Sequence, residues 1–375
     1  MPGPLHSLKV VEMLGLGPCP LAGQLLADLG AHVTVIDRKP GVDISNDVNR
    51  RGKSSIALDL KHPKGIETAL KLLTQSDVLI EGFRPGVMER LGLGPEVCLG
   101  ANPGLVYGRM TGWGQEGPLS NSAGHDINYL AITGALHAMG KRGEPPVPPL
   151  NLVADYGGGS MFLVMGVLAA IIERGISGKG QVIDTAMIDG VPAMMGLIQS
   201  MLPQGTWTRE REDNFIDGGA PYYRCYTCSD GKFISVGAIE PQFFAELVHL
   251  LELDDVLKTE QNEKSGWPQM HALFEETFAQ KTRDEWARIF EKTDACVAPV
   301  LNFEEAASYS HNHERGTFFT ANSVTQTSIA PRFSRSLTRQ PEMQQSTGGD
   351  GAELLANAGL SENDIENLKN QDVLL

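Results

Sequence analysis

The first half of the chain alternates between short apolar runs and amphipathic stretches. Five runs have the length and alternation of β-strands: LKVVEM (8–13), HVTVID (32–37), SIALDL (55–60), DVLIEGF (77–83) and LVYGRM (105–110). Stretches with helical spacing separate them, as at Ala22–Leu29 and Gly65–Thr74. Strands that alternate with helices predict an α/β fold with a parallel, doubly wound sheet of the Rossmann type.

A different pattern follows in the second half of the chain. PYYRCYT, a Ser-Asp-Gly turn and KFISVGA predict a hairpin, and Thr282 with Glu285 predicts a capping box at the start of an amphipathic helix. Two polar or Gly-, Met- and Pro-rich stretches flank this region. The predicted parts are a large domain over 1–190 joined by 335–375, a small α+β domain over 220–311, and linkers over 191–219 and 312–334.

Composition narrows the classes of function. The chain has 375 residues, of which 41% are hydrophobic and 21% charged, as is typical of a globular enzyme with more than one domain. A net charge of −15 opposes binding to nucleic acid or to an anionic membrane. Five cysteines do not suggest a disulfide framework. The longest apolar run, which starts at Met161, predicts a buried core helix and no membrane span, so we expect a soluble intracellular protein.

Three short motifs resemble ligand sites but differ from them in detail. GLGPCPLAGQLLADLG, followed by Asp37, has the outline of a dinucleotide site, yet Pro18 removes a backbone N–H and Pro20 replaces the third glycine. CYTC lies in a predicted strand and no second ligand pair follows, so we predict no metal site. GKS at 52–54 lacks the upstream glycine of a phosphate loop. A structural βαβ unit is the better interpretation of the first motif.

Basic residues recur near the ends of the predicted strands. They are Arg38, Arg50, Arg51, Lys53, Lys61, Arg84 and Arg90. Because strand ends at one edge of a parallel sheet bind ligands, this clustering in an acidic protein favours a phosphate pocket. Scattered, solvated surface charge is the alternative.

Three residues are candidates for chemistry. His125 in AGHDINYLA heads a predicted helix, Asp155 in NLVADYGGG precedes a glycine-rich turn, and Glu240 in VGAIEPQFF stands directly before Pro241. The two carboxylates could cap helices or take part in catalysis, and a lone helical histidine is more often structural.

Six segments carry a resemblance to a known family: GHDINYLA, PLNLVADYGGGSM, GKGQVIDTAMIDG, DGGAPYYRCYT, VGAIEPQFF and TDACVAPVLNFEEA. In these the chain resembles the α-methylacyl-CoA racemases of the family III CoA-transferase superfamily, from VVEM near the start to about Phe318. The resemblance implies that His125 and Asp155 are the two catalytic bases and that Glu240 of the partner subunit pairs with the histidine. Asp126 and Asn151 then match supporting residues of the site.

The same resemblance implies how the substrate is held. Arg38, Arg84 and Arg90 match positions that bind the adenosine phosphates of CoA, and Lys53 and Lys61 are further candidates. The implied fold is an interlocked homodimer with active sites at the subunit interface, and the implied reaction needs no cofactor beyond the CoA of the substrate.

The implied activity is inversion of the α-carbon of 2-methyl-branched acyl-CoA thioesters through an enolate, which requires two bases. Backbone N–H groups of the glycine-rich segment after Asp155 are candidate donors to the enolate, and Asp155 is expected to titrate higher than a free aspartic acid.

Two other functions stay open at this point. One is a CoA-transferase of the same superfamily, with Asp155 as nucleophile, and the other is a non-catalytic acyl-CoA-binding protein. The combination of His125 with Glu240 favours the racemase. The sequence does not decide between bile-acid, pristanoyl-type and arylpropionyl thioesters as substrates. It also does not decide whether the acyl group contacts the Met-rich segment. The expected compartment is mitochondrial or peroxisomal in an animal and cytoplasmic in a bacterium.

Overall fold

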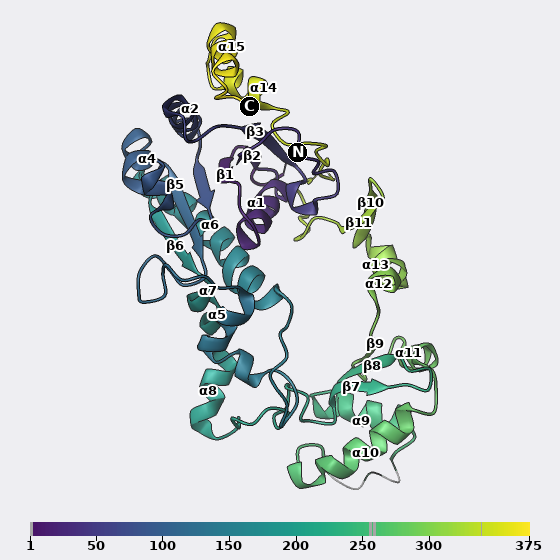
Figure 1. Cartoon of the computed structure of the whole chain (residues 1–375). Coiled ribbons are helices and arrows are strands. Elements are labelled where there is room, and N and C mark those ends of the chain that lie inside the picture. Colours follow the sequence, from purple (N-terminus) through teal and green to yellow (C-terminus); the bar gives the residue numbers. More distant parts are fainter. Residues whose placement is uncertain (1–2, 255–256, 258–259, 339) are drawn as a thin grey trace. The chain divides into compact units, whose positions relative to one another are not determined.

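The computed structural model describes residues 3–254, 257, 260–338 and 340–375, and the chain divides into two compact units (Figure 1). The larger unit comprises the residues up to Thr133, Leu150–Met194 and His311–Leu375, and the smaller unit comprises Gly134–Pro149 and Met195–Ser310.

A six-stranded parallel sheet forms the centre of the larger unit, which confirms the predicted α/β class. Its strands are β1 (Lys9–Met13), β2 (His32–Asp37), β3 (Lys53–Ala57), β4 (Val78–Glu81), β5 (Val106–Thr111) and β6 (Val182–Ala186). The five predicted strands are confirmed, and β6 was not predicted. The spatial order β3-β2-β1-β4-β5-β6 reverses at β1, so the carboxyl ends of β1 and β4 flank the topological switch point of the sheet.

Among the described residues, nine α-helices lie within the larger unit. A tenth, α13 (Ser310–Arg315), crosses the boundary between the two units. The nine are α1 (Pro18–Asp28), α2 (Pro63–Leu73), α3 (Val87–Arg90), α4 (Pro95–Ala101), α5 (Asp126–Thr133), α6 (Phe162–Ser177), α7 (Met187–Met194), α14 (Gly351–Asn357) and α15 (Glu362–Asn370). Proline stands at the first helical position of α1, α2 and α4, where its missing N–H costs nothing. The C-terminal helices close the core, because Leu355 and Leu368 pack with Ile56 and Leu79 of the sheet.

Three buried ion pairs connect helix α1, the strands β1–β3 and the turn before β3. The pairs are Glu12–Lys53, Asp28–Arg51 and Asp37–Arg50. The helix lies so close that a Cβ added at Gly23 would stand 1.8 Å from Oε2 of Glu12. This part of the sheet is therefore held by paired charges in addition to apolar contacts.

The glycine-rich segment after Asp155 is a π-helix (Leu152–Met161) that continues into α6, and the predicted turn at this position is wrong. Close packing explains the glycines, because a Cβ added at Gly190 of α7 would lie 2.0 Å from the carbonyl oxygen of Gly158. π-helical segments are rare overall, and those that occur are frequently at functional sites.

The α6 helix differs from the predicted buried core helix. One of its faces is exposed, with exposed fractions of 58% for Met165, 71% for Ile172 and 86% for Ile176. Among the described residues, the run Leu152–Ser177 is the one helical stretch long and apolar enough to cross a membrane by length and composition. Helices of globular proteins pass the same test, and this one packs on β5 and β6 of the sheet.

The smaller unit is an antiparallel sheet with helices beside it. Its elements are β7 (Tyr223–Thr227), β8 (Phe233–Gly237), β9 (Val297–Pro299), α8 (Gly196–Gln204), α9 (Pro241–Leu250), α10 (Trp267–Phe278), α11 (Arg283–Phe290) and α12 (Phe303–Ser308). The predicted hairpin and the capping box of Thr282 and Glu285 are confirmed. Tyr226, Phe274, Phe278 and Trp286 form an aromatic core.

The units differ from the predicted domain boundaries in three places. Residues 195–219 of the first predicted linker, with α8, belong to the smaller unit. Residues 134–149 belong to the smaller unit, where the Arg211 guanidinium donates hydrogen bonds to three of their carbonyl oxygens. The predicted linker 312–334 contains a hairpin of β10 (Phe318–Ala321) and β11 (Val324–Thr327) within the larger unit. Arg51 donates to the Thr327 carbonyl over 2.7 Å, so a buried charge anchors this segment.

Candidate active site

A cavity of about 250 Å³ opens at the carboxyl ends of β1, β4 and β5. It is lined by the turn Leu16–Cys19 after β1, by Gly82 after β4, by Met110–Gly112 at the carboxyl end of β5, and by His125 and Asp155. This is the switch point of the sheet, where doubly wound folds bind their ligands. The structure therefore brings two of the predicted catalytic residues to one cavity.

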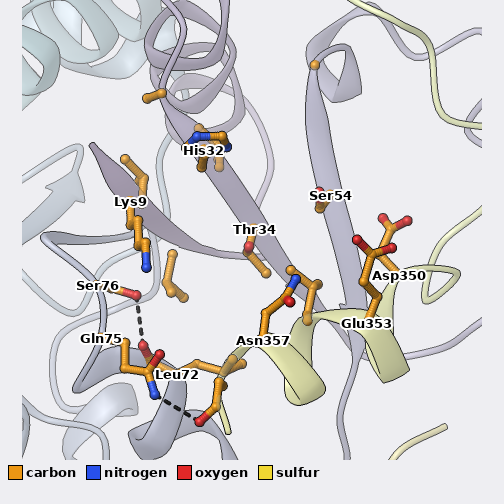
Figure 2. Close-up of a pocket in the computed structure, with 17 residues that line it drawn as sticks. Lys9, His32, Thr34, Ser54, Leu72, Gln75, Ser76, Asp350, Glu353 and Asn357 are labelled. Atoms are coloured by element: carbon orange, nitrogen blue, oxygen red, sulfur yellow. Dashed lines mark hydrogen bonds between the residues drawn. The ribbon is translucent and has the colours of Figure 1, made fainter. Parts of the chain in front are cut away.

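A separate cavity of about 460 Å³ lies at the amino-terminal halves of β1–β3, beside α2 and α14 (Figure 2). Figure 2 shows Thr34 and Ser54 on the strands that border it, and Gln75 at its edge, where the amide donates to the Ala358 carbonyl. None of the predicted catalytic or CoA-binding residues is among the described residues that line it. We therefore place the candidate active site at the switch point.

His125 stands immediately before α5, as the sequence predicts, and is exposed to the cavity. Its backbone N–H donates to Oδ1 of Asn128 over 3.1 Å, and its carbonyl accepts the Asn128 N–H over 2.8 Å. This reciprocal pair fixes the backbone, while the imidazole makes no hydrogen bond to any other side chain or carbonyl in the described part of the chain. The ring is available to accept a proton.

Asp155 lies in the first turn of the π-helix and is half-buried. A Cβ added at Gly17 would stand 3.5 Å from Oδ2 of Asp155, and Gly17 has a φ of +69° that favours glycine. Glycine thus keeps the space before the carboxyl open. Burial raises the pKa of Asp155 to about 6, the negative charge of Asp126 adds to the rise, and His125 opposes it. The pKa of Asp155 is therefore raised, in the direction that the sequence predicts.

Asp126 connects the two candidate bases through the backbone. It is the first residue of α5 and is 6% exposed. Its Oδ2 accepts the N–H groups of Ala154 over 2.9 Å and of Asp155 over 2.8 Å, and its Oδ1 is buried without a hydrogen-bond partner among the described residues. The carboxylate therefore holds the start of the π-helix against the start of α5.

Asn151 directly precedes the π-helix, and its carbonyl accepts the N–H of Tyr156 over 3.3 Å. Its side chain makes no capping hydrogen bond, so its supporting role stays a prediction. The glycine N–H groups that we expected to bind the enolate lie inside the π-helix. There an N–H donates to the carbonyl five residues earlier, which removes Gly157–Gly159 from that role.

Sequence reasoning missed Tyr129, which lines the cavity one helical turn after His125. Its ring packs edge-to-face on Trp113 with 4.7 Å between centroids, and its hydroxyl donates to the Gly124 carbonyl. Burial, together with the charge of Asp155, raises the pKa of the Tyr129 hydroxyl. The four-residue spacing from His125 in HDINY was the available signal, because it places both side chains on one helix face.

Arginines surround the adjoining segment after β4. Arg84 and His125 both line another cavity, of about 240 Å³, which shares Gly82 with the cavity at the switch point. The Arg38 guanidinium stacks over the Phe83 ring, 5.7 Å from the ring centroid. A terminal nitrogen of Arg90 lies close to Gly86, because a Cβ added at Gly86 would stand 3.1 Å from it. The three predicted CoA-binding arginines are exposed; Arg84 and Arg90 belong to the segment after β4, and Arg38 contacts Phe83 of that segment.

The two lysines of the predicted CoA site differ in environment. Lys61 is exposed in the loop after β3, and its role stays a prediction. The Lys53 ammonium is fully buried, donating to Oε2 of Glu12 over 2.6 Å and to the Pro20 carbonyl over 2.8 Å. We therefore correct the prediction for Lys53, because a buried, paired charge cannot reach a phosphate at the surface.

Glu240 belongs to the smaller unit, at the end of the loop that follows β8. It precedes α9 as predicted, but its side chain makes no capping hydrogen bond and is exposed. Gln261 holds the loop by donating to the Ala238 and Ile239 carbonyls. The helix-capping interpretation of Glu240 is therefore not supported, and its carboxylate is available to another group.

Comparison with known proteins found similarity to a family model, to two named proteins and to a solved structure. The family model for CoA-transferase family III matches residues 5–347. The chain is 43% identical to the mouse protein named alpha-methylacyl-CoA racemase and 42% identical to the human one, each over 99% of this chain and 97% of the relative. The crystal structure of a CAIB/BAIF family protein from Brucella suis matches with a TM-score of 0.82 and 25% identity, over 96% of this chain and 100% of that one.

Proposed function

The chain belongs to CoA-transferase family III, and from this premise we propose that it is an isomerase that inverts the α-carbon of 2-methyl-branched acyl-CoA thioesters. One observation carries the proposal: His125 and Asp155, two side chains able to transfer protons, line a single cavity at the switch point of the sheet. The near full-length similarity to two proteins named as racemases supports the same activity.

Inversion requires a base on each face of the α-carbon. One base removes the α-proton, and the electron pair of the broken C–H bond moves into the thioester to give an enolate with its charge on oxygen. The conjugate acid of the other base then gives its proton to the opposite face. We assign the two bases to His125 and Asp155, which exchange protonation states in each turnover.

The raised pKa of Asp155 suits this exchange. A free aspartic acid has a pKa of about 3.9, so its carboxyl would ordinarily hold no proton near neutral pH. Burial raises the pKa of Asp155 to about 6, which brings it closer to neutral pH. A reversible racemase needs Asp155 in both protonation states, and the raised pKa populates the protonated state more than in a free aspartic acid.

The enolate oxygen needs hydrogen-bond donors. The first N–H groups of a helix have no acceptor within the helix, and the helix dipole adds partial positive charge there. Helix α5 begins at Asp126, next to His125, so we propose the N–H groups of Asp126 and Ile127 as donors. The buried Asp126 carboxylate keeps this helix end beside Asp155.

We propose that Arg38, Arg84 and Arg90 hold the phosphates of CoA, with Lys61 as a further candidate. In a protein of net charge −15, an anionic ligand requires a local group of cations. Arg84→Ala should raise KM for acyl-CoA by about tenfold or more and change kcat little, because the ground and transition states share phosphate contacts. Steady-state kinetics with one acyl-CoA measure both constants. A fall in kcat with unchanged KM would remove Arg84 from the CoA site.

A homodimer is part of the proposal. The exposed apolar face of α6, with Met165, Ile172 and Ile176, is of the kind that soluble proteins cover by association. The chain leaves the larger unit and returns to it after the smaller one, as interlocked subunits require. In this dimer Glu240 of the partner subunit would face His125, where its free carboxylate would stabilise the imidazolium form.

A transferase with Asp155 as nucleophile and a non-catalytic acyl-CoA-binding protein are the alternatives. The experiment is incubation of the protein with one epimer of a 2-methylacyl-CoA in deuterated water, without any acceptor acid. A racemase produces the other epimer with deuterium at the α-carbon, and that is the result we expect. A transferase would need the acceptor acid, and a binding protein would leave the epimer unchanged.

A further inference from the structure

Residues 82–90, the segment between β4 and the end of α3, carry two of the proposed CoA-binding arginines but have little core of their own. Of the four residues of α3, Met88 alone is buried. Arg84, Glu89 and Arg90 are exposed. Apolar packing therefore holds this segment at Met88 and, in part, at Phe83, and polar contacts must hold the exposed arginines in place.

Arg109 of β5 supplies that support. It lies opposite Glu81, the last residue of β4, in the register of the two parallel strands. Its Nε donates to Oε1 of Glu81 over 3.0 Å, and its two terminal nitrogens donate to the two carboxylate oxygens of Glu89 over 2.8 and 3.3 Å. A planar guanidinium can pair with one carboxylate through both terminal nitrogens and still donate to a second one through Nε, a geometry that a lysine ammonium lacks.

The network reaches the backbone of the segment as well. Oε2 of Glu81 accepts the N–H of Phe83 over 2.7 Å, which sets the turn directly before Arg84. Phe83 in turn lies under the Arg38 guanidinium. Glu89 is the immediate neighbour of Arg90. Arg109 is thus connected to the start of the segment through the Glu81 carboxylate and to its end through the Glu89 carboxylate.

We infer that Arg109 is a positioning residue for acyl-CoA binding, which holds residues 82–90 against the sheet so that Arg84 and Arg90 meet the CoA phosphates. The inference rests on the proposed function, because it takes these arginines as the phosphate ligands. Arg109 itself does not touch the substrate, since its side chain is 8% exposed and paired on both sides.

A purely structural role is the other interpretation, and the chain offers a matched control. Arg174 of α6 pairs with Asp77 over 2.9 Å and donates to the Gly104 carbonyl over 3.0 Å. Asp77 and Gly104 precede β4 and β5, so Arg174 ties the same two strands at their opposite ends. An arginine that only stabilises the sheet should behave as Arg174 does.

The variant Arg109→Met is expected to fold. Burial raises the pKa of Glu81 to about 7 even beside Arg109, so without the guanidinium the carboxyl should take up a proton near neutral pH. No bare buried charge is then left behind, and Glu89 has water around its 44% exposed side chain. Far-ultraviolet circular dichroism of both variants checks that they are folded.

The test compares Arg109→Met with Arg174→Met. We expect Arg109→Met to raise KM for acyl-CoA about tenfold with kcat within about threefold, and Arg174→Met to leave both constants near the wild-type values. In the Arg84→Ala background, Arg109→Met should raise KM by less than about threefold, because one of the two phosphate contacts through which it acts is already lost. Equal KM changes in the two methionine variants, or full additivity with Arg84→Ala, would overturn the inference.

Calorimetric titration with coenzyme A alone separates this inference from the function on which it rests. If the wild type binds CoA and Arg109→Met binds it about tenfold more weakly, the inference holds. If both bind it equally, Arg109 is structural and the proposed function stands. If the wild type binds no CoA, the proposed function is wrong, and so is the inference that rests on it.

Discussion

Replacement of His125 by Ala or of Asp155 by Asn should each lower the rate of racemisation by about three orders of magnitude or more. Each change removes one of two bases that have to act in the same turnover, so neither residue can compensate for the other. The position of Asp155 does not depend on its own side chain, because Asp126 binds its backbone N–H. Asp155→Asn should therefore remain folded.

The measurement is kcat for conversion of one epimer of a 2-methylacyl-CoA. Asp189→Asn is a suitable control, since this exposed carboxylate of α7 is not among the described residues that line the cavity. Its rate should stay within about twofold of wild type. If Asp155→Asn abolishes acyl-CoA exchange with acceptor acids while His125→Ala keeps that exchange near the wild-type rate, the chemistry is acyl transfer and His125 is a structural residue.

Replacement of Lys53 by Met should destabilise the protein by about 3–5 kcal/mol without affecting the affinity for CoA. The change removes the cation that neutralises Glu12, whose carboxylate is 1% exposed beneath α1. Burial already raises the pKa of Glu12, against the pull of Lys53, so the unpaired carboxyl would have to be buried bare or take up a proton. Either outcome costs folding free energy.

Urea-induced unfolding, followed by circular dichroism, measures this loss. Lys61→Met is the matched control, because that lysine is exposed, and it should change the unfolding free energy by no more than about 0.5 kcal/mol. The double variant Glu12→Leu with Lys53→Met should recover much of the stability, because no charge is left unpaired. A stable Lys53→Met protein with a raised KM for acyl-CoA would instead restore Lys53 to the CoA site.

The contrast between Lys53 and Arg84 shows what a sequence can reveal about a charged residue. Lys53 lies two residues before a predicted strand and Arg84 directly follows one, so the strand pattern placed both near the sheet correctly. Whether the side chain turns inward depends on a partner elsewhere in the sequence, here Glu12 on a neighbouring part of the sheet. An acidic residue inside the apolar run KVVEM was a signal that such a buried partner exists.

The five predicted strands of the large sheet and the helices α1, α2 and α11 follow from local periodicity, whereas the π-helix does not. Its turns depend on the approach of Gly158 to Gly190, residues that the chain separates by 32 positions and that only tertiary packing brings together. The same dependence hid Arg109, which reads as one polar residue in the strand LVYGRM. Its function is visible only when β5 lies beside β4 and Glu81. His125 and Asp155, in contrast, were found from the motifs around them.

The most direct test of the two-base account is α-hydrogen exchange in the single variants, each given one pure epimer in deuterated water. If His125 and Asp155 serve opposite faces, His125→Ala and Asp155→Asn should each exchange the α-hydrogen of one epimer only, without inversion, and the two variants should choose opposite epimers. Exchange of the same epimer by both variants, or of both epimers by either one, would contradict the assignment of one base to each face.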